Sequence, residues 1–444
     1  GITLSWIIKN YLKETRENET GAQCYPPGLR HSVAFIYPNV YHLGMSNLGM
    51  HILYQLINAR GDSACERFFL PDKKLQQEHI KSKTPLLSIE SGRALADFDV
   101  IFVMMSFEMD YDNLMTVLDL GNVKLRAAER NAREPLVIIG GPCATFNPEP
   151  LAAVADAFVI GEGEETVQHI LDEIYAKDSK EERLLALAQL PGVYVPRFYT
   201  AQYDDEGEFA GLQAAAGVPQ TVAPEAGSER MRAAINKGIT EQHVYDAIEL
   251  AAGAGMRNIK LYYMIGLPGE EDDDIVETVE MIKRIRAKMD AVGNKGELVI
   301  SVNGFVPKPF TPYQWSPLCN VRTLKQRFKM LNDGLKKDRR IKLITESLKE
   351  TVVQSVLARG DRRIGEALLE AHESGRNLKQ VLKARGIDAE ELAERELVVG
   401  KPLPWQHLDM GVTEKYLALE LERSKGGKFT PMCFDGCKRC GVCG

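Results

Sequence analysis

Short apolar runs alternate with helical patterns through the first third of the chain. Four runs are short and apolar enough to be buried strands: Val33–Tyr37, Val100–Met105, Leu136–Ile139 and Ala157–Ile160. Helical patterns separate them, as at Gly49–Asn58 and Asp112–Glu129. Alternating strands and helices predict an α/β domain over residues 30–174, built on a doubly wound parallel sheet. Residues 1–29 are expected to form a helical segment ahead of it.

The loops that follow these strands carry the candidate ligand-binding residues of the first domain. Ligands of doubly wound sheets bind at the carboxyl ends of the strands, and glycine lets a ligand approach the backbone closely. The loops span residues 38–46, 106–108, 140–144 and 161–165. The candidates in them are Gly44, Ser46, Ser106, Gly140, Gly141 and Glu162.

A second α/β region follows a polar connector, residues 175–219, which contains a charged helix and a stretch that fits a hairpin. Three strands are expected after the connector: one ending at Thr221–Ala223, then Asn258–Ile265 and Leu298–Val302. Helices begin after Thr240, an N-cap, and after the loop Gly266–Glu270. The second of these places isoleucine and valine on one stripe. Residues 220–321 are assigned to this region, and residues 322–444 are expected to be mostly helical to about Glu396.

Composition and charge exclude several classes of function. The chain has 444 residues, 44% hydrophobic and 26% charged, as expected for a protein with two or three cored domains. Its net charge of −7 argues against a uniformly basic nucleic-acid-binding surface. Because no apolar run is long enough to span a bilayer, we expect no membrane partner and a cytoplasmic location.

Four of the eight cysteines lie in the last twelve residues: Cys433, Cys437, Cys440 and Cys443. The spacing C-x3-C-x2-C-x2-C is too tight for two relaxed disulfides, whereas one ion or cluster can gather four thiolates from a short loop. The sequence therefore predicts a metal or iron–sulfur site at the C-terminal end. Thiolate ligands alone do not distinguish zinc from an iron–sulfur cluster.

Phrases spread over most of the chain resemble a family, the radical S-adenosylmethionine (AdoMet) enzymes. They resemble in particular a bacterial subgroup with a cobalamin-binding-like domain ahead of a (β/α)6 barrel and a C-terminal cysteine cluster. The first domain contributes Tyr37–Ser46, Ile138–Pro142 and Gly161–Glu165. The barrel contributes Ala223–Arg230, Ile235–Ile239, Met264–Glu270 and Phe305–Pro309. The C-terminal part contributes Ala358–Gly365 and the cysteine tail.

The resemblance implies an iron–sulfur enzyme that cleaves AdoMet to a 5′-deoxyadenosyl radical or performs corrinoid-assisted methyl transfer. It implies AdoMet contacts at Glu225, Ser228 and Arg230, and adenine docking at the backbone of Met264, Ile265 and Gly266. The implied cofactors are AdoMet, a catalytic and an auxiliary [4Fe–4S] cluster, and cobalamin as an optional addition. An electron donor such as flavodoxin or ferredoxin is implied too. The substrate, a small molecule, RNA or protein, is not specified.

One departure from the family is large. Its catalytic cluster is held by a C-x3-C-x2-C loop after the first barrel strand, but this chain has no cysteine between Cys143 and Cys319. Only three of the six strand–helix units expected of such a barrel follow Pro219. At about thirty residues per unit, roughly ninety residues are therefore missing. The chain would then hold the second half of a barrel. An omitted segment, a deletion and a non-catalytic descendant are the three explanations.

The terminal cysteines fit an auxiliary centre better than the catalytic one. A fourth thiolate leaves no iron site for AdoMet, and the tail follows the barrel. A [4Fe–4S] cluster is favoured by the resemblance, with zinc as the alternative. The first domain lacks the D-x-H-x-x-G motif of many cobalamin domains, and His42 is the histidine in a suitable loop. Two other functions stay open, a non-catalytic corrinoid- or cluster-binding module and a zinc-ribbon interaction protein.

Overall fold

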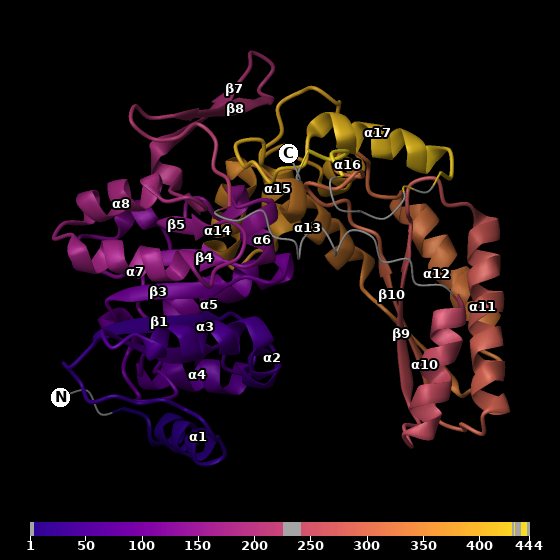
Figure 1. The fold of residues 1–444 in the computed structure, drawn as a ribbon, viewed down its shortest axis with the longest axis horizontal. Helices are drawn as coiled ribbons and strands as arrows, with labels where there is room; N and C mark the ends of the chain where they lie inside the picture. The colour runs from indigo at the N-terminus through magenta and orange to yellow at the C-terminus, as the bar shows by residue number, and fades with distance from the viewer. Residues whose placement is uncertain (1–3, 225–240, 429, 431–436, 442–444) are drawn as a thin grey trace. The chain divides into compact units, whose positions relative to one another are not determined.

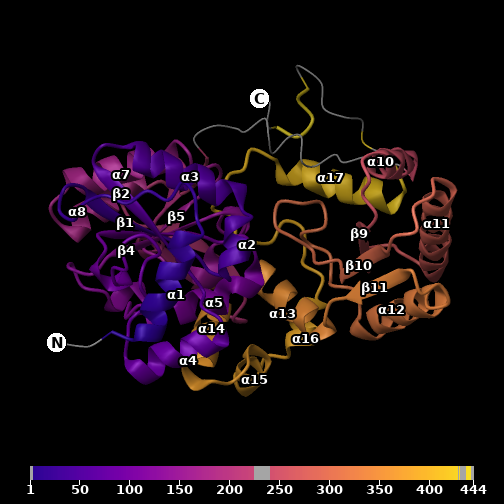
Figure 2. The same ribbon diagram turned by 90° about the horizontal axis from the view of Figure 1, so that it is seen from below.

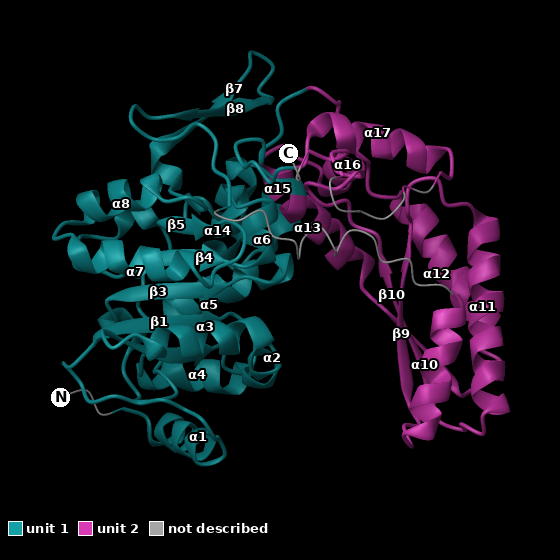
Figure 3. Ribbon diagram, viewed as in Figure 1, with its two compact units in different colours: residues 1–228, 359–381, 401–411 teal, residues 229–358, 382–400, 412–444 magenta. Residues whose placement is uncertain are grey.

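The fold is taken from a computed structural model, which describes residues 4–224, 241–428, 430 and 437–441. The chain divides into two compact units (Figure 3). Unit 1 comprises residues 1–228, 359–381 and 401–411, and unit 2 comprises residues 229–358, 382–400 and 412–444. Residues 359–381 and 401–411 therefore belong to the same unit as the N-terminal part of the chain. The expected division of the chain at residue 321 did not foresee this.

Unit 1 is built on a six-stranded sheet in the order β2-β1-β3-β4-β5-β6 (Figure 1). Its strands are β1 (His31–Tyr37), β2 (Ser63–Phe69), β3 (Val100–Met104), β4 (Leu136–Gly140), β5 (Ala157–Val159) and β6 (Val193–Tyr194). All neighbouring pairs are parallel except β5 and β6. The predicted parallel α/β sheet is confirmed in the described part of the chain, and the strand order reverses between β1 and β3.

Helices bury both faces of this sheet. The helices of unit 1 are α1 (Trp6–Glu17), α2 (Tyr41–Met45), α3 (Leu48–Ala59), α4 (Lys73–Ser82), α5 (Tyr111–Leu120), α6 (Pro142–Phe146), α7 (Thr166–Ala176), α8 (Lys180–Gln189) and α14 (Arg362–Ser374). The division between the units falls within α15 (Leu378–Ala384). Short 3-10 turns are η1 (Leu95–Asp97), η2 (Glu108–Asp110), η3 (Ala127–Glu129), η4 (Glu149–Leu151) and η5 (Pro196–Phe198). Val33 and Phe35 lie in the core with α1, α3 and α7, and the alternate residues Ala34 and Ile36 are buried as well. Burial of successive residues explains why the strands read as continuous apolar runs.

Strand β2 was not predicted, because its sequence Ser-Ala-Cys-Glu-Arg-Phe-Phe contains two adjacent charges. The structure buries both. Arg67 Nε donates to Glu90 Oε1 over 2.6 Å and its Nη2 donates to Glu19 Oε2 over 2.7 Å. Glu66 accepts hydrogen bonds from Ser88 and Ser91. Charges paired in this way can occupy a central position, but their partners lie too far along the chain to be recognised from sequence.

The region expected to be a connector is packed into unit 1. Leu184 and Leu187 of α8, with Val193 of β6, lie in the same core as β1 and β3. The expected hairpin is present as β7 (Tyr199–Tyr203) and β8 (Phe209–Ala214), which pair antiparallel. Only the hairpin fits the description of a polar excursion.

Unit 2 contains a three-stranded parallel sheet in the order β11-β10-β9. The strands are β9 (Ile259–Ile265), β10 (Leu298–Gly304) and β11 (Ile341–Thr345), and the helices are α10 (Glu241–Gly253), α11 (Asp272–Ala291), α12 (Val321–Leu335), α13 (Leu348–Arg359), α16 (Ala389–Ala393) and α17 (Glu414–Lys425). Helices α11 and α12 lie on one side of the sheet (Figure 2). The expected stripe of Ile275, Val279, Ile282 and Ile285 is buried in their shared core.

One expectation about this sheet is wrong. The segment beyond Arg322 is mostly helical, as expected, but it also contains β11, which forms one edge of the sheet; the sequence of β11, Ile-Lys-Leu-Ile-Thr, is short and half polar. Thr221–Ala223, by contrast, does not contribute the expected strand to the sheet. Val222 instead forms a parallel bridge with Leu408, and Ala223 O accepts from Gly192 N over 2.7 Å, all within unit 1. The sheet therefore has three strands, as expected, but β11 takes the place of the strand expected at Thr221–Ala223.

The junction between Pro219 and Gln220 lies in the described part of the chain. Tyr199 donates its hydroxyl to Pro219 O over 2.5 Å, and Gln220 Nε2 donates to Leu212 O over 2.6 Å. Both residues are thus anchored to the β7–β8 hairpin. The half-barrel with a missing segment at this junction stays a prediction.

His372 ties α14 to α5 within unit 1. Its Nδ1 lies 2.8 Å from Asp112 Oδ1 and its Nε2 lies 2.6 Å from Asp119 Oδ2. These two carboxylates raise the pKa of His372 from 6.5 to about 9. At neutral pH the imidazolium therefore bridges the two aspartates, and helix α14, which follows unit 2 in the chain, is held against the first sheet.

We expect unit 1 to lose stability as the pH rises through the raised pKa of His372. A histidine whose folded pKa exceeds its unfolded pKa contributes fully below pH 6.5, and the contribution disappears above about pH 9. Urea unfolding over this range measures it. The difference in unfolding free energy between wild type and His372→Gln should shrink as the pH rises; a constant difference would contradict the ion-pair interpretation.

Candidate functional site

The carboxyl end of β9 holds three of the predicted AdoMet-binding residues, Met264, Ile265 and Gly266. Ile265 is buried and its carbonyl accepts from Phe305 N over 2.8 Å, so its backbone groups face β10. Backbone groups of successive residues in a strand point in opposite directions. Those of Met264 therefore point to the outer edge of β9, where the described residues place no further strand. The Met264 side chain is 55% exposed.

The turn after β9 is held by a carboxylate. Gly266 has φ +85° and donates its N–H to Glu270 Oε1 over 2.7 Å. A Cβ on Gly266 would lie 2.6 Å from Leu324 and 3.0 Å from Cys319, so glycine is required for both its conformation and its space. The loop is therefore more than an ordinary turn, because these contacts hold its backbone in one position at the end of β9.

Arg327 of α12 fixes Glu270 in turn. Its Nη1 lies 3.1 Å from Glu270 Oε1 and its Nη2 donates to Glu270 O over 2.8 Å. Both side chains are almost fully buried, about one tenth exposed, so loss of either partner would leave an uncompensated buried charge. The turn is therefore built by a contact between residues 57 positions apart.

The ends of β10 and β11 supply further polar groups. Asn303 is exposed and stands in register with Met264. The loop after β10 is ordered, since Phe310 N donates to Gln314 Oε1 and Thr311 donates to Lys308 O. Phe310 has φ +60°, a conformation rare for a bulky residue.

Glu346, directly after β11, has a pKa raised by burial and by the nearby Glu350, while Lys308 opposes the shift. The end of β10, the loop after it and the end of β11 thus place the Asn303 amide, the Lys308 amine and the Glu346 carboxyl group at the carboxyl end of the sheet. The remaining predicted AdoMet residues, Glu225, Ser228 and Arg230, lie outside the described residues.

The glycines predicted to admit a corrinoid contact protein atoms instead. A Cβ on Gly44 would lie 2.3 Å from the Phe69 ring, and one on Gly141, at φ +103°, would lie 2.4 Å from Met105 O. A Cβ on Gly140 would make ordinary contact with Val159. Close packing of the domain accounts for Gly44 and Gly141 without a ligand.

The other residues of that set are at or near the surface. Ser46 donates its hydroxyl to His42 O over 2.8 Å, Ser106 is half-buried and Glu162 is exposed. Ligands of doubly wound sheets bind where the strand order reverses, here between β1 and β3. Asn39 and Asp110 join the loops at this point, with Asn39 Nδ2 donating to Asp110 Oδ1 over 2.8 Å. Burial raises the pKa of Asp110.

Two of the four terminal cysteines, Cys437 and Cys440, lie in the described part of the chain, while Cys433 and Cys443 lie outside it. Cys437 is 2% exposed, and its sulfur accepts a hydrogen bond from Arg439 Nε over 3.2 Å. Cys440 O accepts from Thr413 N, the N-cap of α17, over 3.0 Å. A guanidinium beside the sulfur favours the thiolate form that binds metals. Among the residues that the structure describes, no three metal-binding side chains are gathered into a site.

Comparison with known families decides the membership of this chain. The family described as "Radical SAM proteins, N-terminal" matches residues 49–196, and the "Radical SAM superfamily" matches residues 152–282. The chain belongs to the radical SAM superfamily. The superfamily match includes β9 and its turn, and membership implies an enzyme with a [4Fe–4S] cluster and AdoMet without specifying the reaction.

The chain is also similar to an uncharacterized protein of Methanocaldococcus jannaschii. It is 22% identical over 436 aligned positions, which cover 76% of this chain and 90% of the relative. Since 76% of 444 residues is far fewer than 436, roughly a hundred aligned positions have no residue of this chain. No helix in the described part of this radical SAM protein is long and apolar enough to cross a membrane.

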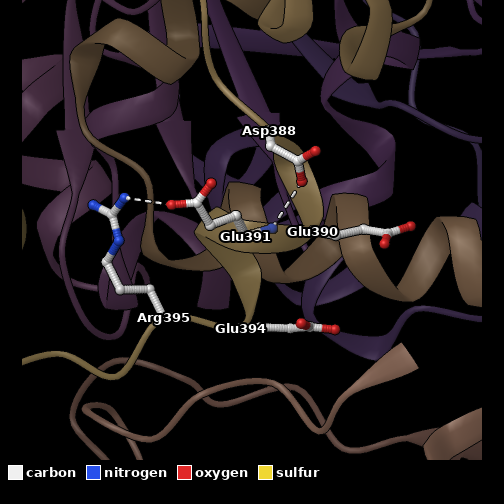
Figure 4. Close-up of a pocket in the computed structure, with 5 residues that line it drawn as sticks. All are labelled: Asp388, Glu390, Glu391, Glu394 and Arg395. Atoms are coloured by element: carbon white, nitrogen blue, oxygen red, sulfur yellow. Dashed lines mark hydrogen bonds and ion pairs between the residues drawn. The ribbon is translucent and has the colours of Figure 1, made fainter. Parts of the chain in front are cut away.

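An open hollow of about 550 Å³ lies beside α16 (Figure 4). It is lined by Asp388, Glu390, Glu391, Glu394 and Arg395. Asp388 caps α16 by accepting from Glu391 N, and Glu394 accepts from Val321 N over 3.0 Å. Asp388 and Glu394 therefore have local structural roles, and none of the lining residues was among the predicted AdoMet-binding residues.

Sequence reasoning identified the turn of this radical SAM protein but not the residues that shape it. Glu270 was part of the recognised phrase without a role of its own, and Arg327 and Cys319 were not singled out. Arg327 lies within an amphipathic helix, where an arginine ordinarily faces solvent. Its burial, 8% exposed, is decided by the position of the β9 turn.

Proposed function

We propose that this chain is a radical AdoMet iron–sulfur protein that binds AdoMet at the carboxyl end of β9 and a second cofactor at its terminal cysteines. It would act in the cytoplasm on a small molecule, RNA or protein, with electrons from a donor such as flavodoxin or ferredoxin. The observation that carries the proposal is the turn Gly266–Glu270, fixed by Arg327 beside an open strand edge.

The residues present fit the adenine end of AdoMet. The N–H and C=O of Met264 point away from β10, so they can pair with the polar edge of a purine while the exposed side chain covers its ring. The fixed turn keeps these groups in place before the ligand arrives, which lowers the entropic cost of binding. By resemblance, Glu225, Ser228 and Arg230 would hold the ribose and the carboxylate.

AdoMet bound to a reduced cluster supplies a 5′-deoxyadenosyl radical, and the protein positions and shields it. The chain does not fit the cluster that this step needs, since no cysteine lies between Cys143 and Cys319. We therefore assign no radical step to the residues present. The hundred or so positions found only in the relative support a segment, missing here, that carries this cluster.

The terminal cysteines fit a fully ligated centre. Cys437 lies in a buried position with a guanidinium at its sulfur, and Cys440 is joined to the start of α17 through its carbonyl. With Cys433 and Cys443 they would supply four thiolates to an auxiliary [4Fe–4S] cluster, or to zinc as the alternative.

A second candidate function is a corrinoid- or cluster-binding module without radical chemistry. The absent cysteine loop favours it. Exposed apolar side chains at the point where the strand order of unit 1 reverses, Leu43, Leu48 and Phe107, would suit a corrin face. The contacts of Gly44 and Gly141 argue against deep insertion of such a ligand.

Anaerobic reconstitution of the full chain with iron and sulfide separates these functions. About four irons per chain, one cluster, with AdoMet binding but no cleavage would fit a chain that lacks the catalytic loop. About eight irons with deoxyadenosine formation would show a complete radical enzyme. Absence of AdoMet binding would refute the proposal, and stable zinc would favour an interaction protein.

We expect Glu270→Gln to weaken AdoMet binding by roughly tenfold or more, since loss of a charge-assisted hydrogen bond costs about 1.5–3 kcal/mol. The change weakens both the Gly266 hydrogen bond and the Arg327 ion pair that position the turn. Calorimetric titration with AdoMet measures the effect. The control is Asp273→Asn, an exposed acid in the first turn of α11; equal losses in both variants would point to a general charge effect.

A further inference from the structure

The outer face of α12 carries a row of basic side chains. The helix packs one side into unit 2, where it buries Leu324, Arg327, Leu331 and Leu335. Positions 322, 325, 329 and 336 lie on the opposite side, because residues three, four and seven apart share a helix face. All four residues are basic and exposed, and together they form the basic stripe: Arg322, Lys325, Lys329 and Lys336.

One acid, Asp333, lies in the stripe. Lys329 Nζ lies 3.3 Å from Asp333 Oδ2, and Lys336 Nζ lies 3.0 Å from Asp333 Oδ1. Both pairs are exposed to solvent, so they contribute little stability and can exchange for other partners. In the described part of the chain, no carboxylate pairs with Arg322 or Lys325. The stripe is therefore basic, although the chain as a whole has a net charge of −7.

The stripe begins on the helix that supports the proposed AdoMet turn. A Cβ on Gly266 would lie 2.6 Å from Leu324, and Arg327 pairs with Glu270 of the same turn. These two residues of α12 face the turn, while the stripe lies on the other side of the helix. A ligand on the stripe is thus about one helix diameter, roughly 10 Å, from the turn.

The side chains of the stripe suit phosphate groups better than a protein surface. Protein interfaces are rich in aromatic side chains and poor in lysine, whereas three of the four stripe residues are lysines. Residues 321–340 are all described, and they include no exposed large apolar side chain that could anchor a protein partner. Lysine and arginine are the usual partners of nucleic-acid phosphates, and the stripe extends for about 20 Å.

The same composition favours a duplex over a single strand. Proteins that bind single strands stack the bases on aromatic side chains, and the stripe offers none. Double-stranded RNA is recognised mainly by its shape and its phosphates, which a row of lysines can contact. The proposed function leaves a small molecule, RNA and protein open as substrates, and of these the stripe fits RNA.

We propose that the basic stripe binds the phosphate backbone of an RNA duplex, and that the substrate of this radical SAM protein is a structured RNA. The inference rests on the proposed function, because it assigns the substrate class of that site. Each basic residue of the stripe would contact one phosphate. The contact ends at the start of α12, where the acid Glu394 accepts from Val321 N over 3.0 Å.

Fluorescence anisotropy of a short labelled RNA duplex, titrated with the full chain over a salt series, tests the proposal. With about four phosphates neutralised, the association constant should fall roughly a hundredfold between about 50 and 200 mM salt.

Removal of charges from the stripe should change this binding in both directions. Lys325→Gln combined with Lys329→Gln should weaken binding at low salt at least tenfold and reduce the salt slope by about one for each lysine. Asp333→Asn should tighten binding severalfold, because it releases Lys329 and Lys336 from their pairs. The control combines Lys73→Gln with Lys74→Gln, two exposed lysines of α4, and should bind as the wild type does.

Absence of RNA binding at low salt would overturn the proposal, as would equal losses in the stripe and control variants or tighter binding of a DNA duplex of the same length. Binding of a flavodoxin that the stripe variants abolish, without RNA binding, would assign the stripe to a protein partner and overturn it too. Circular dichroism detects unfolding of the variants; if the double lysine variant unfolds, Asp333→Asn decides, since unfolding cannot tighten binding.

Calorimetric titration of the same samples with AdoMet is a separate readout. Loss of RNA binding with AdoMet binding intact would refute this inference alone, whereas absence of AdoMet binding would refute the proposed function.

Discussion

Arg362→Ala should destabilise unit 1 by about 3–5 kcal/mol, the cost of leaving a buried charge without its partner. Glu149 is 1% exposed, and Arg362 Nε donates to its Oε2 over 2.8 Å. Arg362 also donates to Tyr194 Oη and to two backbone carbonyls. His407, 3.4 Å from Glu149, cannot replace the lost cation at neutral pH because burial lowers its pKa to about 4. Urea unfolding followed by tyrosine and tryptophan fluorescence measures the loss.

The neighbouring arginine provides a matched control. Arg363 pairs with Asp361 over 2.7 Å and its side chain is 46% exposed. Arg363→Ala should cost less than about 1 kcal/mol, as expected of a surface ion pair. Similar losses of unfolding free energy in the two variants would contradict this interpretation. They would show that either substitution destabilises helix α14 for a reason other than the buried charge.

Cys437→Ser should remove most of the metal bound at the C-terminal end, because a hydroxyl does not replace a thiolate as a ligand for iron or zinc. The chain should then lose about four irons after reconstitution, or one zinc if zinc is the native ion. Elemental analysis and the visible absorption of the cluster report the loss. Arg439→Gln, which removes the hydrogen bond to the Cys437 sulfur, should weaken metal binding about 10–100-fold.

Cys24→Ser is the control for this experiment, since Cys24 is exposed and lies far from the tail in sequence. Its metal content should equal that of the wild type. Unchanged metal in Cys437→Ser would rule out the terminal cysteines as the site. Loss of metal in both variants would indicate non-specific binding of iron or zinc to thiols.

Much of the framework of this protein could be predicted from periodicity. The runs at Val33–Tyr37 and Leu136–Ile139 became central parallel strands because continuous burial needs continuous apolar sequence. The stripe on α11 and the two strands that flank this helix followed from helical and strand spacing in the same way. Local patterns are decisive where a whole element buries one face.

Two strands escaped prediction because their local signal contradicts their environment. β2 carries Glu66 and Arg67, which only become compatible with a core when Ser88, Glu90 and Glu19 surround them. β11 is short and half polar, and it is a strand because the edge of β10 stabilises it. In both cases the partners lie far away in the sequence.

The sequence by itself determined the family and the parallel α/β layout, because each depends on patterns of residues that are close together in the chain; the metal site at the terminal cysteines stays a prediction. Only the tertiary structure decided that Val222 pairs with Leu408 in unit 1, that Arg327 holds the turn at Gly266, and that Gly44 and Gly141 fill protein space. These features depend on which distant segments meet, and the energy of such contacts is set by packing and desolvation, which leave no periodic trace in the chain.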